Sequence, residues 1–148
     1  MLFRSPGEYV HLWASLPCTA GSPWQHVNKK FPSAQEKIDK NLEIFQKLIA
    51  NFEKVARKVV DKGGDVSFEW PSGCSLWDHE ATAKVIEGLS MNKVHLHGCA
   101  AGLVSSKDST PIKKPWTIAS TSPVILEDRK STRLNSSHSQ QSRMPSSA

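Results

Sequence analysis

A cysteine and a glutamate stand near the ends of two strand-like runs. Cys18 follows a run that closes at Leu16-Pro17, and Glu69 lies in a run that closes at Trp70-Pro71. A cysteine thiolate is a strong nucleophile, and a carboxyl group can bind or protonate a substrate. In an open α/β sheet, ligands collect at the carboxyl ends of parallel strands, so these two side chains can face one pocket although they are far apart in the sequence.

A long helix is expected between these two runs. Ser33-Ala34-Gln35-Glu36 has the pattern of a capping box, and apolar residues then recur at spacings of three and four as far as Val59. Gly63-Gly64 is expected to end the helix. A helix of this length is long for a small domain, so a kink or a frayed first turn is expected.

Four short runs rich in β-branched and aromatic residues are predicted strands, at 9–14, 66–70, 93–97 and 116–120. A second helix, capped by Asp78 and running through Leu89, separates the second and third runs. Strands separated by helices favour parallel pairing through right-handed crossovers. The loop from Gly98 to Pro115 has no helical pattern, so the last strand is expected to return antiparallel at an edge.

The predicted fold is therefore an α/β, partial Rossmann-like half-domain with three parallel strands, helices and one antiparallel edge strand. Such a half-sheet should expose one unpaired edge and apolar surface on one side. It is expected to occupy residues 1–127, which suffice for one small domain.

The end of the chain has a different composition. From Asp128 it reads DRKSTRLNSSHSQQSRMPSSA, with no aromatic residue and with Leu134 and Met144 as its sizeable apolar residues. Burial could not offset the entropy of ordering this segment, so 128–148 is predicted to be a disordered tail. The string resembles the translation of a sequencing-library adapter, which implies that it is not native to the domain. It contributes three of the net +5 charges, so the overall basic charge is a weak indication of nucleic-acid binding.

Cysteine usage and hydropathy point to an intracellular protein. The three cysteines, Cys18, Cys74 and Cys99, have no paired spacing, which favours a reducing compartment over a disulfide framework. No apolar run approaches the roughly 20 residues of a membrane span, and the opening MLFRSPGEYVHLW lacks a continuous signal-peptide stretch. A nuclear or cytoplasmic location without a membrane partner is expected, and the oligomeric state is open.

Three segments resemble, in order, motifs of cytosine-5 DNA methyltransferases. SLPCT (15–19) resembles the Pro-Cys segment of that family, FEWP (68–71) resembles its glutamate-containing strand end, and HGCAAGL (97–103) followed by PIKKP (111–115) resembles its later strand, loop and strand. The resemblance implies the C-terminal half of a class I methyltransferase. It implies that Cys18 attacks carbon 6 of a flipped cytosine and that Glu69 holds the ring at N3.

The same resemblance implies further contacts. Pro17 and Trp70 are expected to bind the substrate beside Cys18 and Glu69, and Lys113 and Lys114 are expected to contact phosphate. Nucleic acid, DNA or RNA, is therefore the expected partner. The sequence departs from the usual family residues at Leu16, Thr19 and Trp70-Pro71, and it has lysines where the later loop usually carries glutamine and arginines.

The methyl donor of the presumed full-length parent would be S-adenosylmethionine. Its binding elements, a glycine-rich turn after a first strand and an acidic residue after a second, are expected upstream of the Pro-Cys segment. Neither occurs in this sequence. The chain is therefore expected to bind no cofactor and to be inactive alone.

Two classes of function stay open, and with them the question of whether the chain is an enzyme. The first is a fragment of an S-adenosylmethionine-dependent, cytosine-type nucleic-acid methyltransferase-like domain. The second is a non-catalytic segment of a mobile-element polyprotein, because the same segments from Leu12 to Ser120 resemble domains of retrotransposon-type polyproteins. A third interpretation takes 15–18 as the degenerate Pro-Pro-aromatic turn of an amino-methyltransferase, whose last residue stacks on the target and does not attack it.

Two other groups of residues have alternative interpretations. His95, His97 and Cys99 alternate along one predicted strand and could begin a zinc site, but no fourth ligand is spaced to complete it, so no metal is predicted. Trp24, Trp77 and Trp116 could stack on bases or pack in the core.

Overall fold

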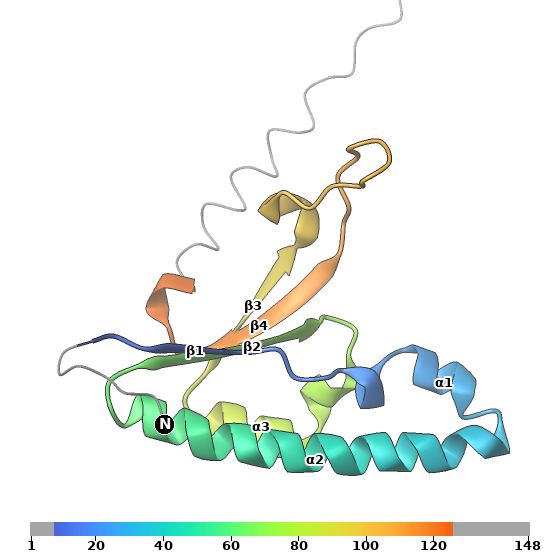
Figure 1. The fold of residues 1–148 in the computed structure, drawn as a ribbon, viewed down its shortest axis with the longest axis horizontal. Coiled ribbons are helices and arrows are strands. Elements are labelled where there is room, and N and C mark those ends of the chain that lie inside the picture. The colour runs from blue at the N-terminus through green and yellow to red at the C-terminus, as the bar shows by residue number, and fades with distance from the viewer. Residues whose placement is uncertain (1–7, 126–148) are drawn as a thin grey trace, which may run out of the picture.

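The computed structural model describes residues 8–125 and shows a mixed α/β fold (Figure 1). The strands are β1 (His11–Ala14), β2 (Asp65–Pro71), β3 (Asn92–His97) and β4 (Pro115–Ser120). The helices are α1 (Trp24–Asn28), α2 (Pro32–Val60) and α3 (Glu80–Gly88), with short 3-10 turns η1 (Thr19–Gly21), η2 (Ser75–Asp78) and η3 (Gly98–Ala101). All four predicted strands are confirmed. The predicted tail, 128–148, lies outside the described residues.

The four strands form one mixed sheet in the order β1-β2-β4-β3. β1 pairs parallel with β2, whereas β4 pairs antiparallel with both β2 and β3. β1, β2 and β3 therefore run in the same direction and β4 alone is reversed, but β1 and β2 are the one pair of parallel neighbours.

The prediction that the last strand lies at an edge is wrong, because β4 lies between β2 and β3. Two physical features explain its place. The connection from β3 to β4 has no long helix, so the two strands pair directly as an antiparallel hairpin. Residues 117–120 of β4 are all buried, which is typical of a strand with neighbours on both sides.

Helix α2 is continuous over 29 residues. Its inner stripe is buried and consists of Ile38, Phe45, Ile49, Phe52 and Ala56. The predicted capping box is wrong, because the helix begins at Pro32 and its N-cap is Phe31, without a side-chain cap hydrogen bond. Proline suits the first helical position, since its fixed φ is helical and its missing N–H would have no partner there. The predicted end at the two glycines is confirmed by the hydrogen bond from the Gly64 N–H to the Val59 carbonyl.

The second predicted helix is confirmed as α3, but its predicted cap is wrong. Asp78 belongs to the preceding turn η2, and the N-cap residue is His79. The Nδ1 atom of His79 accepts a hydrogen bond from the Ala81 N–H at 3.1 Å. An imidazole nitrogen thus satisfies the free N–H for which a carboxylate was expected.

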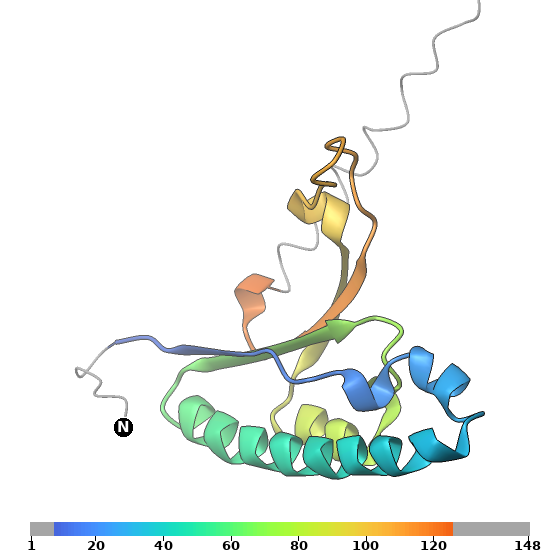
Figure 2. The ribbon, with the colours of Figure 1, turned by 45° about the vertical axis from the view of Figure 1, so that its right-hand side comes forward.

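Both α2 and α3 lie against the same face of the sheet (Figure 2). Alternate residues of β2, namely Val66, Phe68 and Trp70, point into this helix-covered face and are buried. Aromatic rings fill the layer: Phe68 stacks on Trp77 at 5.3 Å between centroids, and Trp70 meets Trp77 edge-on at 4.9 Å. The intervening residues of β2 point to the opposite face, called here the second face.

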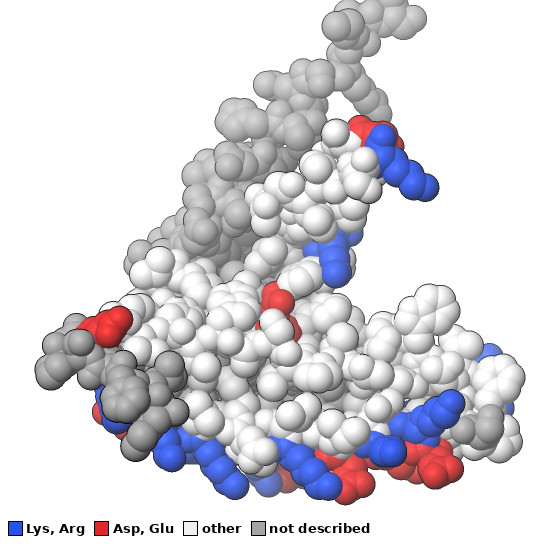
Figure 3. Space-filling model, in the orientation of Figure 1, with Lys and Arg blue, Asp and Glu red and all other residues white. Residues whose placement is uncertain are grey.

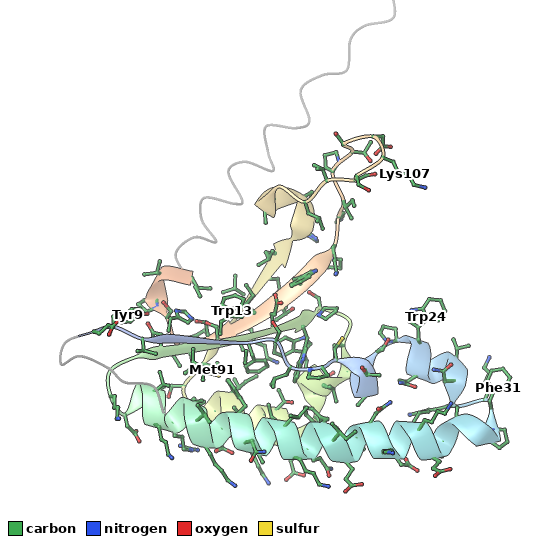
Figure 4. The ribbon with its side chains drawn as sticks, viewed as in Figure 1. Tyr9, Trp13, Trp24, Phe31, Met91 and Lys107 are labelled. Carbon is green, nitrogen blue, oxygen red and sulfur yellow. The ribbon has the colours of Figure 1, made fainter. Side chains whose placement is uncertain are left out.

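Strands β3 and β4 bend away from the helices, so their far ends and connecting loop form an arm that rises above the second face (Figures 1 and 2). Trp13 of β1 also points to the second face and is 46% exposed (Figure 4). In the described residues, β1 pairs on one side, leaving its other edge unpaired. Within 8–125, no helix is long and apolar enough to span a membrane.

Candidate functional site

The second face holds a cavity of about 470 Å³ at the base of the β3–β4 arm. Sheet register brings its walls together, because Glu69 pairs with Ile118 across β2 and β4, and Leu96 pairs with Trp116 across β3 and β4. The lining residues are Glu69, Leu96, Gly98, Ala101, Gly102, Leu103, Trp116 and Ile118. The cavity is thus an apolar pocket with one carboxylate and one indole.

The turn η3 closes one side of this cavity. Gly102 follows it with φ at +82°, in the left-handed region that glycine adopts without strain. The reversal lets the Leu103 N–H donate a 2.8 Å hydrogen bond back to the Gly98 carbonyl. This turn directs Leu103 into the cavity wall and explains the glycine at 102, while a Cβ at Gly98 would lie only 2.7 Å from Leu103 Cδ2.

Two opposed influences act on the Glu69 carboxyl group. Burial in the apolar cavity raises its pKa, and the positive charge of Lys114 lowers it in part, leaving the pKa above its ordinary value. Lys114 itself is exposed, and its Nζ lies 4.6 Å from the centre of the Trp116 ring, a cation–π distance. Lys114 therefore interacts electrostatically with both Glu69 and Trp116 at the cavity.

Trp116 carries a buried polar atom without a partner. Its Nε1 is inaccessible to solvent and has no hydrogen-bond acceptor among the described residues. The two buried tryptophans have partners for their indole N–H groups: Trp70 donates to the Leu16 carbonyl at 2.7 Å and Trp77 donates to the Pro71 carbonyl at 3.2 Å.

Cys18 lies at the same end of the sheet as Glu69, but its side chain has different neighbours. Its side chain is half-buried and packs against the core on the helix-covered side. Its carbonyl oxygen lies 4.0 Å from the Sγ of Cys74 and accepts a 3.0 Å hydrogen bond from the Gly21 N–H. Burial raises the pKa of the Cys74 thiol, a backbone hydrogen bond at Leu76 lowers it, and the nearby Cys18 adds to the increase.

The other predicted substrate-binding residues differ in burial: three are exposed and one is buried. Pro17 is exposed beside Cys18, and Lys113 and Lys114 are exposed where the chain enters β4. Trp70 is only 1% exposed, and its hydrogen bond to Leu16 ties the Pro17–Cys18 segment to β2. The structure thus gives Trp70 a positioning contact.

The structure brings together Glu69, Lys114 and Trp116, and it holds the Cys18 segment at the adjoining strand end. It does not bring Cys18 into the lining of the cavity. Leu96, Leu103 and Ile118 were missed by sequence reasoning. The two glycines in 98–102 could have indicated the tight turn η3 that forms one wall of the cavity. The pairing of Leu96 with Trp116 could not be predicted locally, because it depends on the strand order.

Charge is distributed unevenly over the surface. Figure 3 shows most charged side chains along α2, while the second face is largely uncharged and is hollowed between the arm and the region of α1. Trp24 of α1, 73% exposed, projects toward this hollow, and Lys107 lies at the tip of the arm (Figure 4).

The sequences of the turns and the grouping of side chains both bear on cofactor and metal binding. The turns that follow β1, β2 and β3 read SLPC, SGCS and GCAAG, and none of the three has the glycine spacing G-x-G-x-x-G. Within 8–125, no three His, Cys, Asp or Glu side chains are grouped to hold a metal ion. Comparison of the chain with protein families, with curated proteins and with solved structures finds no match.

Proposed function

We propose that this chain is the target-binding half of a cytosine-type nucleic-acid methyltransferase-like domain. The observation that carries the proposal is the position of Glu69, a carboxyl group in an apolar cavity, on the strand whose next residue, Trp70, is hydrogen-bonded to the segment that bears Cys18. A cavity of about 470 Å³ lies within the range of small-molecule sites, roughly 300–1,000 Å³, and can hold a flipped base.

The raised pKa of Glu69 supports binding of cytosine. The base edge presents N3, an acceptor, beside the N4 amino group, a donor. A neutral carboxyl group presents one donor and one acceptor, which match this pair, whereas a carboxylate presents acceptors alone. Burial of Glu69 favours the neutral form that the cytosine edge requires.

Cys18 is the proposed nucleophile. Its thiolate adds to carbon 6, the carbon 5–carbon 6 double bond becomes single, and carbon 5 takes up a proton or an electrophile. Since the thiol packs toward the core in this structure, the reaction requires the Pro17–Cys18 segment to turn toward the cavity. The hydrogen bond from Trp70 to the Leu16 carbonyl holds the N-terminal end of that segment against β2 while the segment turns.

The sheet supports a half-domain. Three strands run in one direction and the last strand is reversed, as the methyltransferase resemblance implies. The unpaired edge of β1 is where an upstream strand would add. S-adenosylmethionine would supply the methyl group when bound by that upstream part of a parent protein.

Covalent trapping tests the nucleophile without a cofactor. A single-stranded oligonucleotide carrying 5-azacytosine accepts a thiol at carbon 6 and a proton at nitrogen 5, so the adduct appears in an intact-mass spectrum. We expect an adduct with the full chain, none with Cys18→Ser, and a slower one with Glu69→Gln. The exposed Cys99 provides the matched control, because Cys99→Ser should leave the adduct unchanged.

The second candidate is a non-catalytic segment of a mobile-element polyprotein. It is favoured by the inward packing of Cys18, whose side chain is absent from the lining of the Glu69 cavity. This candidate predicts no adduct while Glu69-dependent binding of cytosine oligonucleotides persists. An adduct lost in Cys18→Ser would exclude it.

A further inference from the structure

Two of the three cysteines lie together where the turn η1 meets the turn η2. Cys18 is the N-cap residue of η1, and Cys74 is the N-cap residue of η2. The Cys74 Sγ lies 4.0 Å from the Cys18 carbonyl oxygen, from which the Cys18 Sγ is a few covalent bonds away. The Cys18 side chain packs against the buried cluster to which Cys74 belongs. The two thiols are therefore neighbours, although they are 56 positions apart in the sequence.

Close packing brings the Cys74 sulfur to the turn that carries Cys18. A Cβ at Gly21 would lie 2.8 Å from the Cys74 Sγ, so the absence of a side chain at this position permits the approach. The Gly21 N–H closes the turn through a 3.0 Å hydrogen bond to the Cys18 carbonyl. The Cys74 backbone is fixed as well, since its N–H donates to the Pro71 carbonyl and its carbonyl accepts from the Trp77 N–H. Both cysteines thus stand on hydrogen-bonded turns.

The two thiols differ in their access to solvent. Cys18 is half-buried, whereas Cys74 is only 3% exposed. Burial raises the pKa of the Cys74 thiol, a backbone hydrogen bond at Leu76 lowers it, and the charge of the nearby Cys18 raises it further. Redox-sensing pairs have this arrangement, in which an accessible thiol meets the oxidant and a second thiol beside it resolves the product.

We propose that Cys18 and Cys74 are a redox couple, in which a hydroperoxide oxidises Cys18 and Cys74 resolves the product to an intramolecular disulfide. With hydrogen peroxide, the Cys18 sulfur attacks one oxygen, the O–O bond breaks, and a sulfenic acid and water form. The Cys74 sulfur then attacks the Cys18 sulfur, the S–O bond breaks, and the hydroxyl leaves as water with the proton of the Cys74 thiol. Two thiols are oxidised to one disulfide, and one peroxide is reduced to two water molecules.

The disulfide would hold the Cys18 segment on the helix-covered side of the sheet. The sulfur of Cys18 would then be neither a nucleophile nor free to turn toward the Glu69 cavity. Oxidation therefore switches off any chemistry that Cys18 performs, and a dithiol reductant restores it. The inference does not rest on the proposed function, because the disulfide forms without a ligand in the cavity.

Peptide mapping of the full chain tests the inference. Trypsin places the three cysteines in separate peptides, 5–29, 63–84 and 94–107. The reduced, folded chain is treated with hydrogen peroxide, remaining thiols are alkylated with iodoacetamide, and the digest is analysed by mass spectrometry without reduction. We expect peptides 5–29 and 63–84 to be joined, and the Cys99 peptide to be alkylated. Dithiothreitol added before alkylation should separate the joined peptides.

Three variants separate the roles of the thiols. In Cys74→Ala the Cys18 sulfenic acid has no resolving thiol, so its labelling by dimedone, a reagent for sulfenic acids, should rise several-fold over the wild type. Cys18→Ser should form no disulfide with Cys74. Cys99→Ser is the matched control, because Cys99 is exposed in η3 on the arm (Figure 1). It should form the same disulfide as the wild type.

Three results would overturn the inference. In the first, peroxide leaves both Cys18 and Cys74 free to be alkylated. In the second, the main linkage involves Cys99, within one chain or between two chains. In the third, the Cys18–Cys74 linkage forms in urea but not in the folded chain, so that the fold does not bring the thiols together. All three are measured on the wild type, so an unstable Cys74→Ala would not affect them. No nucleic acid is present, so a failure here leaves the 5-azacytosine test of the proposed function unchanged.

Discussion

The indole nitrogen of Trp70 donates a hydrogen bond to the Leu16 carbonyl oxygen across 2.7 Å. This bond joins the buried end of β2 to the segment that carries Cys18. Trp70→Phe should remove the bond and leave a space in the core, lowering the free energy of unfolding by about 2–4 kcal/mol. Urea denaturation measures this loss, and Trp13→Phe, at a side chain 46% exposed, should change stability little.

The same substitution should free the Cys18 segment. In a Cys99→Ser background, the rate at which Ellman's reagent labels Cys18 should rise in Trp70→Phe, because the segment is no longer anchored. An unchanged labelling rate would show that the Leu16 contact does not position the thiol.

The chain passes very close to the core at Gly21. A methyl group added there would lie 2.6 Å from Leu76 Cγ, 2.7 Å from the Leu76 backbone nitrogen and 2.8 Å from Cys74 Sγ. Gly21→Ala should therefore cost about 1–3 kcal/mol of unfolding free energy. Gly73→Ala is the control, since its nearest new contact would be at 3.8 Å, and a thermal melt should find it unchanged.

Glu69 should make stability depend on pH. Its pKa is raised above the ordinary 4.5 by burial, against the opposing effect of Lys114. An acid whose pKa is higher in the folded than in the unfolded chain contributes stability to the fold. This contribution is fully present at pH values below the unfolded pKa, and it is lost as the pH rises through the folded pKa. The free energy of unfolding of Glu69→Gln, minus that of the wild type, should therefore increase from pH 4 to pH 7. Urea unfolding of both proteins at pH 4 and at pH 7 measures this difference. A difference that decreases with rising pH would contradict the prediction.

Asp65 should act in the opposite sense. Burial would raise its pKa, but hydrogen bonds from Tyr9, Thr121 and Ser122 outweigh burial and lower the pKa below 3.8. The stabilisation is present above 3.8 and is lost as pH falls through the lowered folded value. Asp65→Asn should cost about 1–3 kcal/mol at pH 7 and progressively less in acid. Equal losses at pH 7 and pH 2.5 would show that the charge is not responsible.

Methyl transfer should be absent from the chain alone. Incubation of the full chain with labelled S-adenosylmethionine and cytosine-containing DNA or RNA should leave no label on the nucleic acid, because the turns after β1, β2 and β3 lack the glycine-rich sequence expected to hold the methyl donor. Label that appears and is abolished by Cys18→Ala would refute the half-domain proposal while establishing the nucleophile.

Local patterns in the sequence predict the elements well but not their neighbours. The spacing from Ile38 to Val59 predicts α2, and β-branched residues predict all four strands. The centre of the sheet could not be predicted in this way, because an antiparallel return after β3 fits an edge and an interior position equally. Burial of both faces of 117–120 decides between them, and it depends on the tertiary structure.

The candidate site shows the same division. Glu69 is predicted by its place at a strand end, whereas the facing of Cys18 is not, since a four-residue excursion after β1 can present a thiol to either side. Trp116 enters the cavity because β3 and β4 pair in one register, and no local pattern encodes that register. The cap at His79 was missed because Asp78 beside it is the commoner capping residue.

The central position of β4 constrains the order in which the chain can fold. Among the strands of the described residues, β4 is the last to leave the ribosome, and it pairs with β2 in contacts as distant in sequence as Ser67 with Ser120. Until residue 120 has emerged, β3 has no strand to bind and the buried middle of the sheet is missing. Ordering of β1, β2 and α2 can come first, but closure of the sheet, and with it the Glu69 cavity, has to wait for β4 and is governed by long-range contacts.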